Sequence, residues 1–261
     1  MINFPWSKLH ASTIRVEKLD EKTIGRLFYL YQHYYENTSI EVFEKDLKEK
    51  THIILLKNRK GREQGFSTLT RRDIEVEGRN YHVLYSGDTI ISPDYWGTAA
   101  LTMEFLKNII SAKVKRPFSP VYWFLISKGY KTYLLLANNF INYYPRYDKQ
   151  TPKREEKMLK SISDSFFPSV YNEETGLLTF DRSSHEKLKS FVAPITDEMK
   201  VKYPKIAFFE KKNPDWMIGD ELACIGRVDL SLVIVHPFKI LMKKGKKLKS
   251  IGVEFLASLA K

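Results

Sequence analysis

Residues 81–110 read YHVLYSGDTIISPDYWGTAALTMEFLKNII, and this stretch decides the fold. Apolar and polar residues alternate up to residue 92, which is typical of a β-strand, and the residues after 98 are largely apolar, as in a buried helix. A tight Pro-Asp-Tyr-Trp-Gly turn joins the two. The first N–H groups of a helix have no partner inside it and lie at the positive end of its dipole. The turn at Gly97 therefore predicts a place where an anion can bind close to the backbone.

The residues before this stretch predict two helices and an antiparallel sheet. Residues 21–35 repeat apolar side chains at the three- and four-residue spacing of an amphipathic helix. Thr38 and Glu41 have the spacing of a capping box, which would begin a second short helix. The strands expected next, joined by tight turns, are residues 52–57, 65–77 and 81–92.

The residues after this stretch predict further alternation of helix and strand. We expect a helix from residue 98 to about 112, a buried strand over 120–126, a helix over 132–144 that Pro145 ends, and a strand over 205–211. We expect residues 1–210 to form the core, with 148–200 as an insertion or a cover on the substrate side. Residues 211–261 are then a C-terminal extension packed on the core.

Composition limits the classes of protein that the chain can belong to. Its 261 residues are 43% hydrophobic, enough for a substantial core in one or two domains and too apolar for a disordered chain. A single cysteine, Cys224, excludes an internal disulfide and a multi-cysteine zinc site. No apolar run resembles a secretory signal or a membrane span, so we expect a cytoplasmic protein.

Charge points to anionic partners. The chain carries 43 Lys and Arg against 31 Asp and Glu, a formal charge of +12. Such a charge favours a nucleotide-containing cofactor, an acidic carrier protein or nucleic acid, and does not choose among them. The sequence has no Gly-x-Ser-x-Gly, His-Glu-x-x-His or Walker motif, so hydrolase, metalloprotease and P-loop functions lose their usual support.

The turn resembles the acyl-CoA-binding motif of the GNAT acyltransferase superfamily. That motif reads Gln/Arg-x-x-Gly-x-Gly/Ala, and residues 94–99 match it at Gly97 and Ala99 and depart from it at Asp94. The expected element order, two helices, three antiparallel strands, the turn and a helix, is also that of the GNAT core. The resemblance implies an α/β (α+β) fold with a mixed, mostly antiparallel central sheet flanked by helices, here with a helical insertion and a C-terminal extension.

The same resemblance implies an activity and a donor site. A GNAT-like enzyme moves an acyl group from an acyl thioester to an amine without a metal, and the strand over 120–126 would diverge from its neighbour to admit the pantetheine arm. The donor would be acyl-CoA, or acyl-phosphopantetheine on an acidic acyl carrier protein, which suits a basic chain with Asp94 in the turn. The residues expected to bind the donor are Tyr95, Trp96, Gly97, Thr98, Ala99 and Ala100.

Three residues are candidates for catalysis. Asp88 lies where many GNAT proteins carry a catalytic glutamate, so it could accept the proton of the amine or anchor it. A bulge at Gly87 and Asp88 with a structural carboxylate is the alternative. Tyr144 matches the family's tyrosine near the coenzyme sulfur, with Tyr143 as the substitute if the register is off by one. His82 could relay protons or be structural.

Alternatives to an enzyme of this kind stay open at this point. Basic residues interleaved with aromatic ones, as in residues 144–149, are compatible with a nucleic-acid-binding protein, although no recognised binding motif is present. A non-catalytic interaction protein with the GNAT fold is a third option. Asp220 and Glu221 could bind a cationic substrate or could be ordinary carboxylates on a helix surface.

Overall fold

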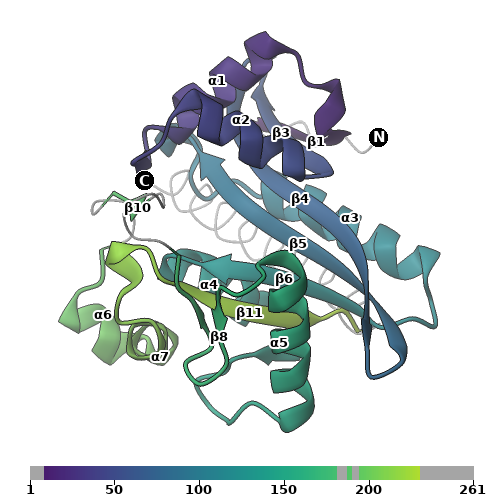
Figure 1. Ribbon diagram of the computed structural model, residues 1–261. Helices are drawn as coiled ribbons and strands as arrows, with labels where there is room; N and C mark the ends of the chain where they lie inside the picture. Colours follow the sequence, from purple (N-terminus) through teal and green to yellow (C-terminus); the bar gives the residue numbers. More distant parts are fainter. Residues whose placement is uncertain (1–8, 181–186, 190–193, 230–261) are drawn as a thin grey trace, which may run out of the picture.

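The computed structural model describes residues 9–180, 187–189 and 194–229 (Figure 1). The strands are β1 Leu9–Arg15, β2 Tyr35–Glu36, β3 His52–Asn58, β4 Glu63–Val76, β5 Arg79–Ile91, β6 Val121–Ser127, β7 Tyr143–Tyr144, β8 Tyr171–Asn172, β9 Leu177–Leu178, β10 Lys187–Leu188 and β11 Glu221–Arg227. The helices are α1 Glu21–Tyr31, α2 Ile40–Glu49, α3 Ala100–Lys115, α4 Tyr130–Asn139, α5 Lys153–Phe166, α6 Asp197–Lys202 and α7 Pro204–Lys212. Short 3-10 helices cover Val16–Lys18, Pro93–Tyr95 and Trp216–Ile218.

A single large sheet organises the described residues. Its strand order is β1-β3-β4-β5-β6-β11-β9-β8, with β7 paired to β11, while β2 and β10 form a separate pair. The contact between β5 and β6 is parallel and the other pairings are antiparallel within the described ranges. Parallel neighbours need a crossover connection, and α3 supplies it. The mixed, mostly antiparallel sheet flanked by helices is the fold class that the sequence predicts.

Alternation along the strands separates two faces of this sheet. On β6, Val121, Trp123 and Leu125 pack against α3 and α4, whereas Tyr122 and Phe124 pack against α5. Helices α1 and α2 cover the same face as α5 over the other half of the sheet, through a third cluster of buried side chains. Figure 1 shows α3 and α4 behind the sheet and α5 in front of it.

Several expected elements differ from the structure. Ser39, and not Thr38, caps α2, because its Oγ accepts a hydrogen bond from the amide of Val42 at 3.3 Å. The expected helix over 132–144 begins at Tyr130 and ends at Asn139, because the residues that follow turn to pair with β11. The expected strand over 205–211 is helix α7, which has Pro204 in its first turn.

Two of the strands that were not predicted are seven residues long. β1 pairs with β3 at one edge of the sheet, and β11 lies inside the sheet between β6 and β9. Residues 221–227 were expected in a C-terminal extension, so the sheet continues well past residue 210. Helix α5, in the expected insertion, buries Met158 and Ile162 against the same sheet. Residues 230–261 lie outside the described part of the chain.

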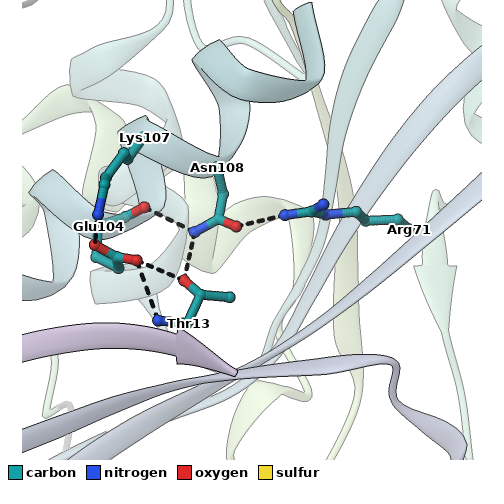
Figure 2. Close-up of polar contacts among 5 residues, drawn as sticks. All are labelled: Thr13, Arg71, Glu104, Lys107 and Asn108. Atoms are coloured by element: carbon teal, nitrogen blue, oxygen red, sulfur yellow. Dashed lines mark hydrogen bonds and ion pairs between the residues drawn. The ribbon is translucent and has the colours of Figure 1, made fainter. Parts of the chain in front are cut away.

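A polar network fastens α3 to the edge of the sheet (Figure 2). The Oε1 of Glu104 accepts hydrogen bonds from the amide and the hydroxyl of Thr13, at 3.1 and 2.7 Å. Asn108 donates from Nδ2 to Thr13 Oγ1 at 2.7 Å and accepts at Oδ1 from Arg71 at 2.6 Å. An edge strand leaves amides without partners in the sheet, and here a buried carboxylate on α3 accepts from one of them.

We expect Asn108→Ala to lower the free energy of unfolding by roughly 1–2 kcal/mol, because it removes a partner from the half-buried groups of Arg71 and Thr13. Urea denaturation would measure the change. Lys107→Ala is the matched control, since the Lys107 ammonium is 71% exposed and bonds to the same Glu104. That variant should cost less than ~1 kcal/mol. Equal effects of the two substitutions would contradict a supporting role for the network.

Candidate functional site

The strands β5 and β6 separate at a bulge. They pair from His82 opposite Val121 to Ser86 opposite Leu125. On its other side β5 pairs with β4, where Leu69 faces Ser86 and Ser67 faces Thr89. Gly87 and Asp88 therefore lie opposite the single residue Thr68, which is the two-against-one pattern of a β-bulge. β5 continues along β4 to Ile91 after its pairing with β6 has ended.

A pocket lies where the strands separate, between α3 and α4. Its side chains are mostly apolar, with a few polar groups where the sheet forms its floor, as in many small-molecule sites. Trp123 donates from Nε1 to Ser86 Oγ at 2.8 Å, and the hydroxyls of Ser67 and Thr89 are 2.8 Å apart. The lining residues are Ser67, Ser86, Thr89, Leu101, Thr102, Phe105, Leu106, Ile109, Trp123, Leu135, Asn139 and Phe140.

The turn before α3 leads into a helix whose N-cap residue, Ala99, makes no side-chain capping hydrogen bond. Gly97 has φ +77°, a backbone conformation that glycine adopts without the strain of a side chain. The first bond into the helix runs from the amide of Met103 to the carbonyl of Ala99, and no side chain caps Ala99 within the described residues. Thr98 Oγ1 accepts from the amide of Ala100 at 3.3 Å. As at any helix start, the other amides of the first turn have no carbonyl partner inside the helix.

A lysine from the next helix stands beside this turn. Lys131 lies in the first turn of α4, and its Nζ is 4.7 Å from the centre of the Trp96 ring. Trp96 in turn donates from Nε1 to the carbonyl of Ile91 at 2.7 Å. The Lys131 ammonium therefore brings a positive charge to the turn. The turn itself has the acidic Asp94 where the GNAT motif has Gln or Arg. The sequence around Lys131 carries no signal for this, because only the packing of α4 against the turn brings the two together.

The opposite face of the sheet is polar at the bulge. A Cβ on Gly87 would lie 2.5 Å from Thr68 Oγ1, 3.3 Å from Tyr85 Oη and 3.6 Å from Lys50 Cε. The Nζ of Lys50 is 2.6 Å from Asp46 Oδ1. Three polar side chains thus converge on the one bulge residue that has no side chain of its own.

The bulge that was the structural alternative for Asp88 is present. Asp88 is half-buried and lies on the strand that leads to the turn. Burial is the largest cause that raises the pKa of the Tyr85 hydroxyl well above its usual value, followed by the charges of Glu221, Asp88 and Asp46. Tyr85 therefore keeps its proton in the neutral range. The catalytic role of Asp88 stays a prediction.

A buried ion pair contains Glu221, which acts on Tyr85 as Asp46 does. Lys128 Nζ is 3.5 Å from Glu221 Oε1, and their side chains are only 10% and 6% exposed. The same ammonium is 5.0 Å from the centre of the Tyr35 ring. Glu221 begins β11 and Asp220 is buried next to it, so neither is a carboxylate on a helix surface.

Tyr144 does not lie on a helix. It forms β7 opposite Ile225 and packs on the side of the sheet that α5 covers. Its neighbour Tyr143 packs on the other side, with its ring 6.3 Å from that of Tyr133. Tyr144 is not among the residues that line the pocket between α3 and α4.

His82 lies at the far end of β5 from the bulge, about 17 Å away at the rise of an extended strand. Its Nδ1 is 2.5 Å from Asp73 Oδ1, and Asp73 also binds Arg116 at 3.2 Å. Burial is the largest influence on His82 and lowers its pKa, although Asp73 acts in the opposite direction. His82 thus lies apart from Asp88, although both are on β5.

The described residues contain no cluster of His, Cys, Asp and Glu that could hold a metal ion. Among the helices that are described, none has the length and apolar character to span a bilayer.

The element order, the separation of β6 from its neighbour β5 and the turn before α3 are those that the resemblance implied. The fold is GNAT-like. No protein-family model matches the chain, and no curated protein matches it.

Solved GNAT structures overlap only part of this fold. A GNAT family N-acetyltransferase from Escherichia coli, solved with CoA, is 12% identical, with 53% of this chain and 74% of that chain covered and a TM-score of 0.37. A Trypanosoma brucei acetyltransferase is 15% identical, with 55% and 97% covered and a TM-score of 0.35. A probable N-acyltransferase from Enterococcus faecalis is 14% identical with a TM-score of 0.36; 49% of this chain is covered, and the match spans 31% of the other protein's length.

The burial of His82 predicts a dependence of stability on pH. Its folded pKa lies below that of the unfolded chain, about 6.5. The unfolded state therefore binds a proton first as the pH falls, and the stability that neutral His82 contributes is complete above pH ~6.5 and is lost below it. We expect the free energy of unfolding to decrease between pH 7 and pH 5, and to decrease less in His82→Gln.

Urea titrations at each pH would measure this slope. Some slope should remain in the variant, because burial also lowers the pKa of His52. Asp73, whose pKa is lowered first by its hydrogen bond with His82, loses its contribution at more acidic pH, outside this window. An unchanged slope in His82→Gln would show that His82 is not the group that titrates.

Proposed function

We propose that the protein is an acyltransferase that moves an acyl group from acyl-CoA to an amine. One observation carries the proposal: the two faces of the sheet meet at the Gly87–Asp88 bulge, with a largely apolar pocket on one face and converging polar side chains on the other. A thioester held in the first and an amine held in the second could meet where β5 and β6 separate.

The donor would lie along the pocket between α3 and α4. Its pantetheine arm is slender and only weakly polar, which suits the apolar lining with hydroxyls from β4 and β5. Its pyrophosphate would bind at the turn formed by Tyr95, Trp96, Gly97, Thr98, Ala99 and Ala100, because the N-cap Ala99 makes no side-chain bond to the first amides of α3. Lys131 adds the positive charge that the turn itself lacks.

The reaction needs two proton transfers. The amine nitrogen attacks the thioester carbonyl, a C–N bond forms, the C–S bond breaks, and the acyl group leaves with the amine. Asp88 is our candidate to accept the proton that the amine releases, because it lies in the bulge. The departing thiolate takes up a proton. Tyr144 is the residue that the resemblance suggests for this step; it lies on the α5 side of the sheet and does not line the pocket, so substitution with Phe is the test of this role.

A carrier protein could present the same chemical group. CoA and acyl carrier proteins share the phosphopantetheine arm, and the charge of +12 suits an acidic carrier. Transfer from acetyl-CoA in the absence of carrier would support the free coenzyme as donor. Transfer only from the acylated carrier would mean that the donor is the carrier protein. The phosphopantetheine arm would still be expected in the same pocket.

We expect acetyl-CoA to raise the midpoint of thermal unfolding and Thr102→Trp to abolish the rise, because the indole would occupy the pocket. A ligand at about 100 times its Kd stabilises the folded state by about 2.7 kcal/mol. Met103→Trp is the matched control, since Met103 is the next residue on α3 and does not line the pocket. No rise with the unmodified protein, or an equal loss in both variants, would count against this donor site.

We expect Lys131→Ala to weaken the binding of CoA about two- to fivefold and to leave pantetheine unaffected, because pantetheine has no phosphate for the ammonium to attract. Calorimetric titration would give both dissociation constants. Lys115→Ala, at the other end of α3, should change neither. Equal weakening of CoA and pantetheine would place the effect of Lys131 on the arm and not on the pyrophosphate.

A further inference from the structure

The pocket between α3 and α4 has two ends of different character. Leu101 and Thr102 lie in the first turn of α3, shortly after Gly97, and Ile109 lies about 12 Å farther along the helix axis. Thr102 is partly exposed, whereas Ile109 is only 2% exposed. A guest that enters beside the turn at Gly97 therefore reaches Ile109 last.

The end that contains Ile109 lies past the point where the strands separate. The pairing of β5 with β6 ends at Ser86 opposite Leu125, and Trp123 lies within the paired part, opposite Leu84. Trp123 lines the pocket and donates from Nε1 to Ser86 Oγ. An acyl group that continues along the pocket from a thioester at the separation would therefore meet Trp123 and Ile109.

The pantetheine arm does not need this end of the pocket. From Ser86 to Ile91, β5 extends about 17 Å beyond its last pairing with β6, at the rise of an extended strand. That length is comparable with an extended pantetheine arm, and backbone groups that have left β6 can pair with the two amides of the arm. Thr89, Leu101 and Thr102 line the pocket over this part. The space beyond Ser86 is left for what the thioester carries.

Aromatic side chains make up much of that space. We call it the inner end of the pocket and define it by Phe105, Ile109, Trp123 and Phe140, all of them buried. The ring centres of Phe105 and Phe140 are 4.6 and 5.2 Å from that of Trp123. Hydrocarbon that moves from water to such a wall is stabilised, so each buried methylene group should tighten binding about fourfold.

The polar groups on the pocket wall already have partners in the protein. The hydroxyls of Ser67 and Thr89 are 2.8 Å apart, and Ser86 accepts from the indole. Asn139 donates from Nδ2 to the carbonyl of Leu135 at 2.6 Å. A wholly apolar guest leaves these bonds intact, whereas a polar guest has to compete for them.

We infer that the inner end binds the alkyl part of the acyl group, and that the preferred donor carries a medium-length chain and not acetyl. The inference rests on the proposed acyl transfer and specifies its donor. From Phe105 to Ile109 the helix advances by about 6 Å, which leaves room for about four methylene groups beyond the thioester. A hexanoyl group fills this length. The chain passes unchanged to the amine when the C–N bond forms and the C–S bond breaks.

Calorimetric titration with acetyl-, butanoyl-, hexanoyl-, octanoyl- and decanoyl-CoA tests the inference without turnover. We expect butanoyl-CoA to bind about fifteenfold more tightly than acetyl-CoA, because two more methylene groups are buried. Hexanoyl-CoA should bind most tightly and decanoyl-CoA more weakly, because Ile109 limits the inner end. Equal binding of acetyl-CoA and hexanoyl-CoA, or steady tightening up to decanoyl-CoA, would overturn the inference.

Ile109→Ala is the deciding variant, because it lengthens the inner end. We expect the tightest ligand to change from hexanoyl-CoA to octanoyl-CoA, with the affinity for acetyl-CoA nearly unchanged. Ile54→Ala is the matched control, since Ile54 is buried in the same cluster and does not line the pocket. It should destabilise the protein and keep the preference for hexanoyl-CoA. If Ile109→Ala does not fold, Ile109→Val should shift the preference in the same direction by less.

The outcomes separate this inference from the proposed function. Binding of acetyl-CoA with no dependence on chain length would leave the donor site standing and remove the chain pocket. A preference for hexanoyl-CoA that neither substitution of Ile109 alters would place the chain elsewhere and also overturn the inference. Binding of none of the thioesters would overturn the donor site, and the inference with it.

Discussion

The parallel contact between β5 and β6, and its end at the Gly87–Asp88 bulge, is the constraint on which the rest of the structure depends. Parallel neighbours must be joined by a crossover, so α3 has to run back across one face of the sheet. That requirement places the turn before α3 at the end of β5 where the strands separate. Helix α4, which follows β6, packs beside α3 on the same face, and the pocket lies between them.

The bulge also gives the two faces of the sheet different chemistry. Along β5, Ser86 lies on the pocket side and Tyr85 on the other, because successive side chains of a strand alternate. At the bulge, the side chains of Thr68, Tyr85 and Lys50 approach Gly87 closely on the face opposite the pocket. A glycine fits there because it has no side chain. The backbone of the bulge therefore separates a largely apolar pocket on one face from polar side chains on the other.

Only part of this site could be predicted from the sequence. Gly97 and the small residues after it form a local pattern that predicts a turn into a helix, and in the structure Gly97 has a positive φ shortly before α3 begins. Lys131, Lys50 and Glu221 come from α4, α2 and β11, and no local pattern connects them with the turn or the bulge. Tyr144 is a second example, because its local sequence predicts a helix that the structure does not have. The residues after α4 pair instead with β11, a strand more than 80 positions later in the chain.

The sequence by itself determined the elements whose signals are local: the amphipathic helix α1, the three strands β3 to β5, the turn at Gly97, the apolar helix α3 and the strand β6. These depend on side-chain periodicity and on turn residues, which act within a few positions of the chain. The tertiary structure decided the place of β1 and β11 in the sheet, the helical form of residues 204–212 and the approach of Lys50, Thr68 and Tyr85 to Gly87. Pairing and burial between distant segments settle those features, because their free energy comes from partners that no local stretch of sequence contains.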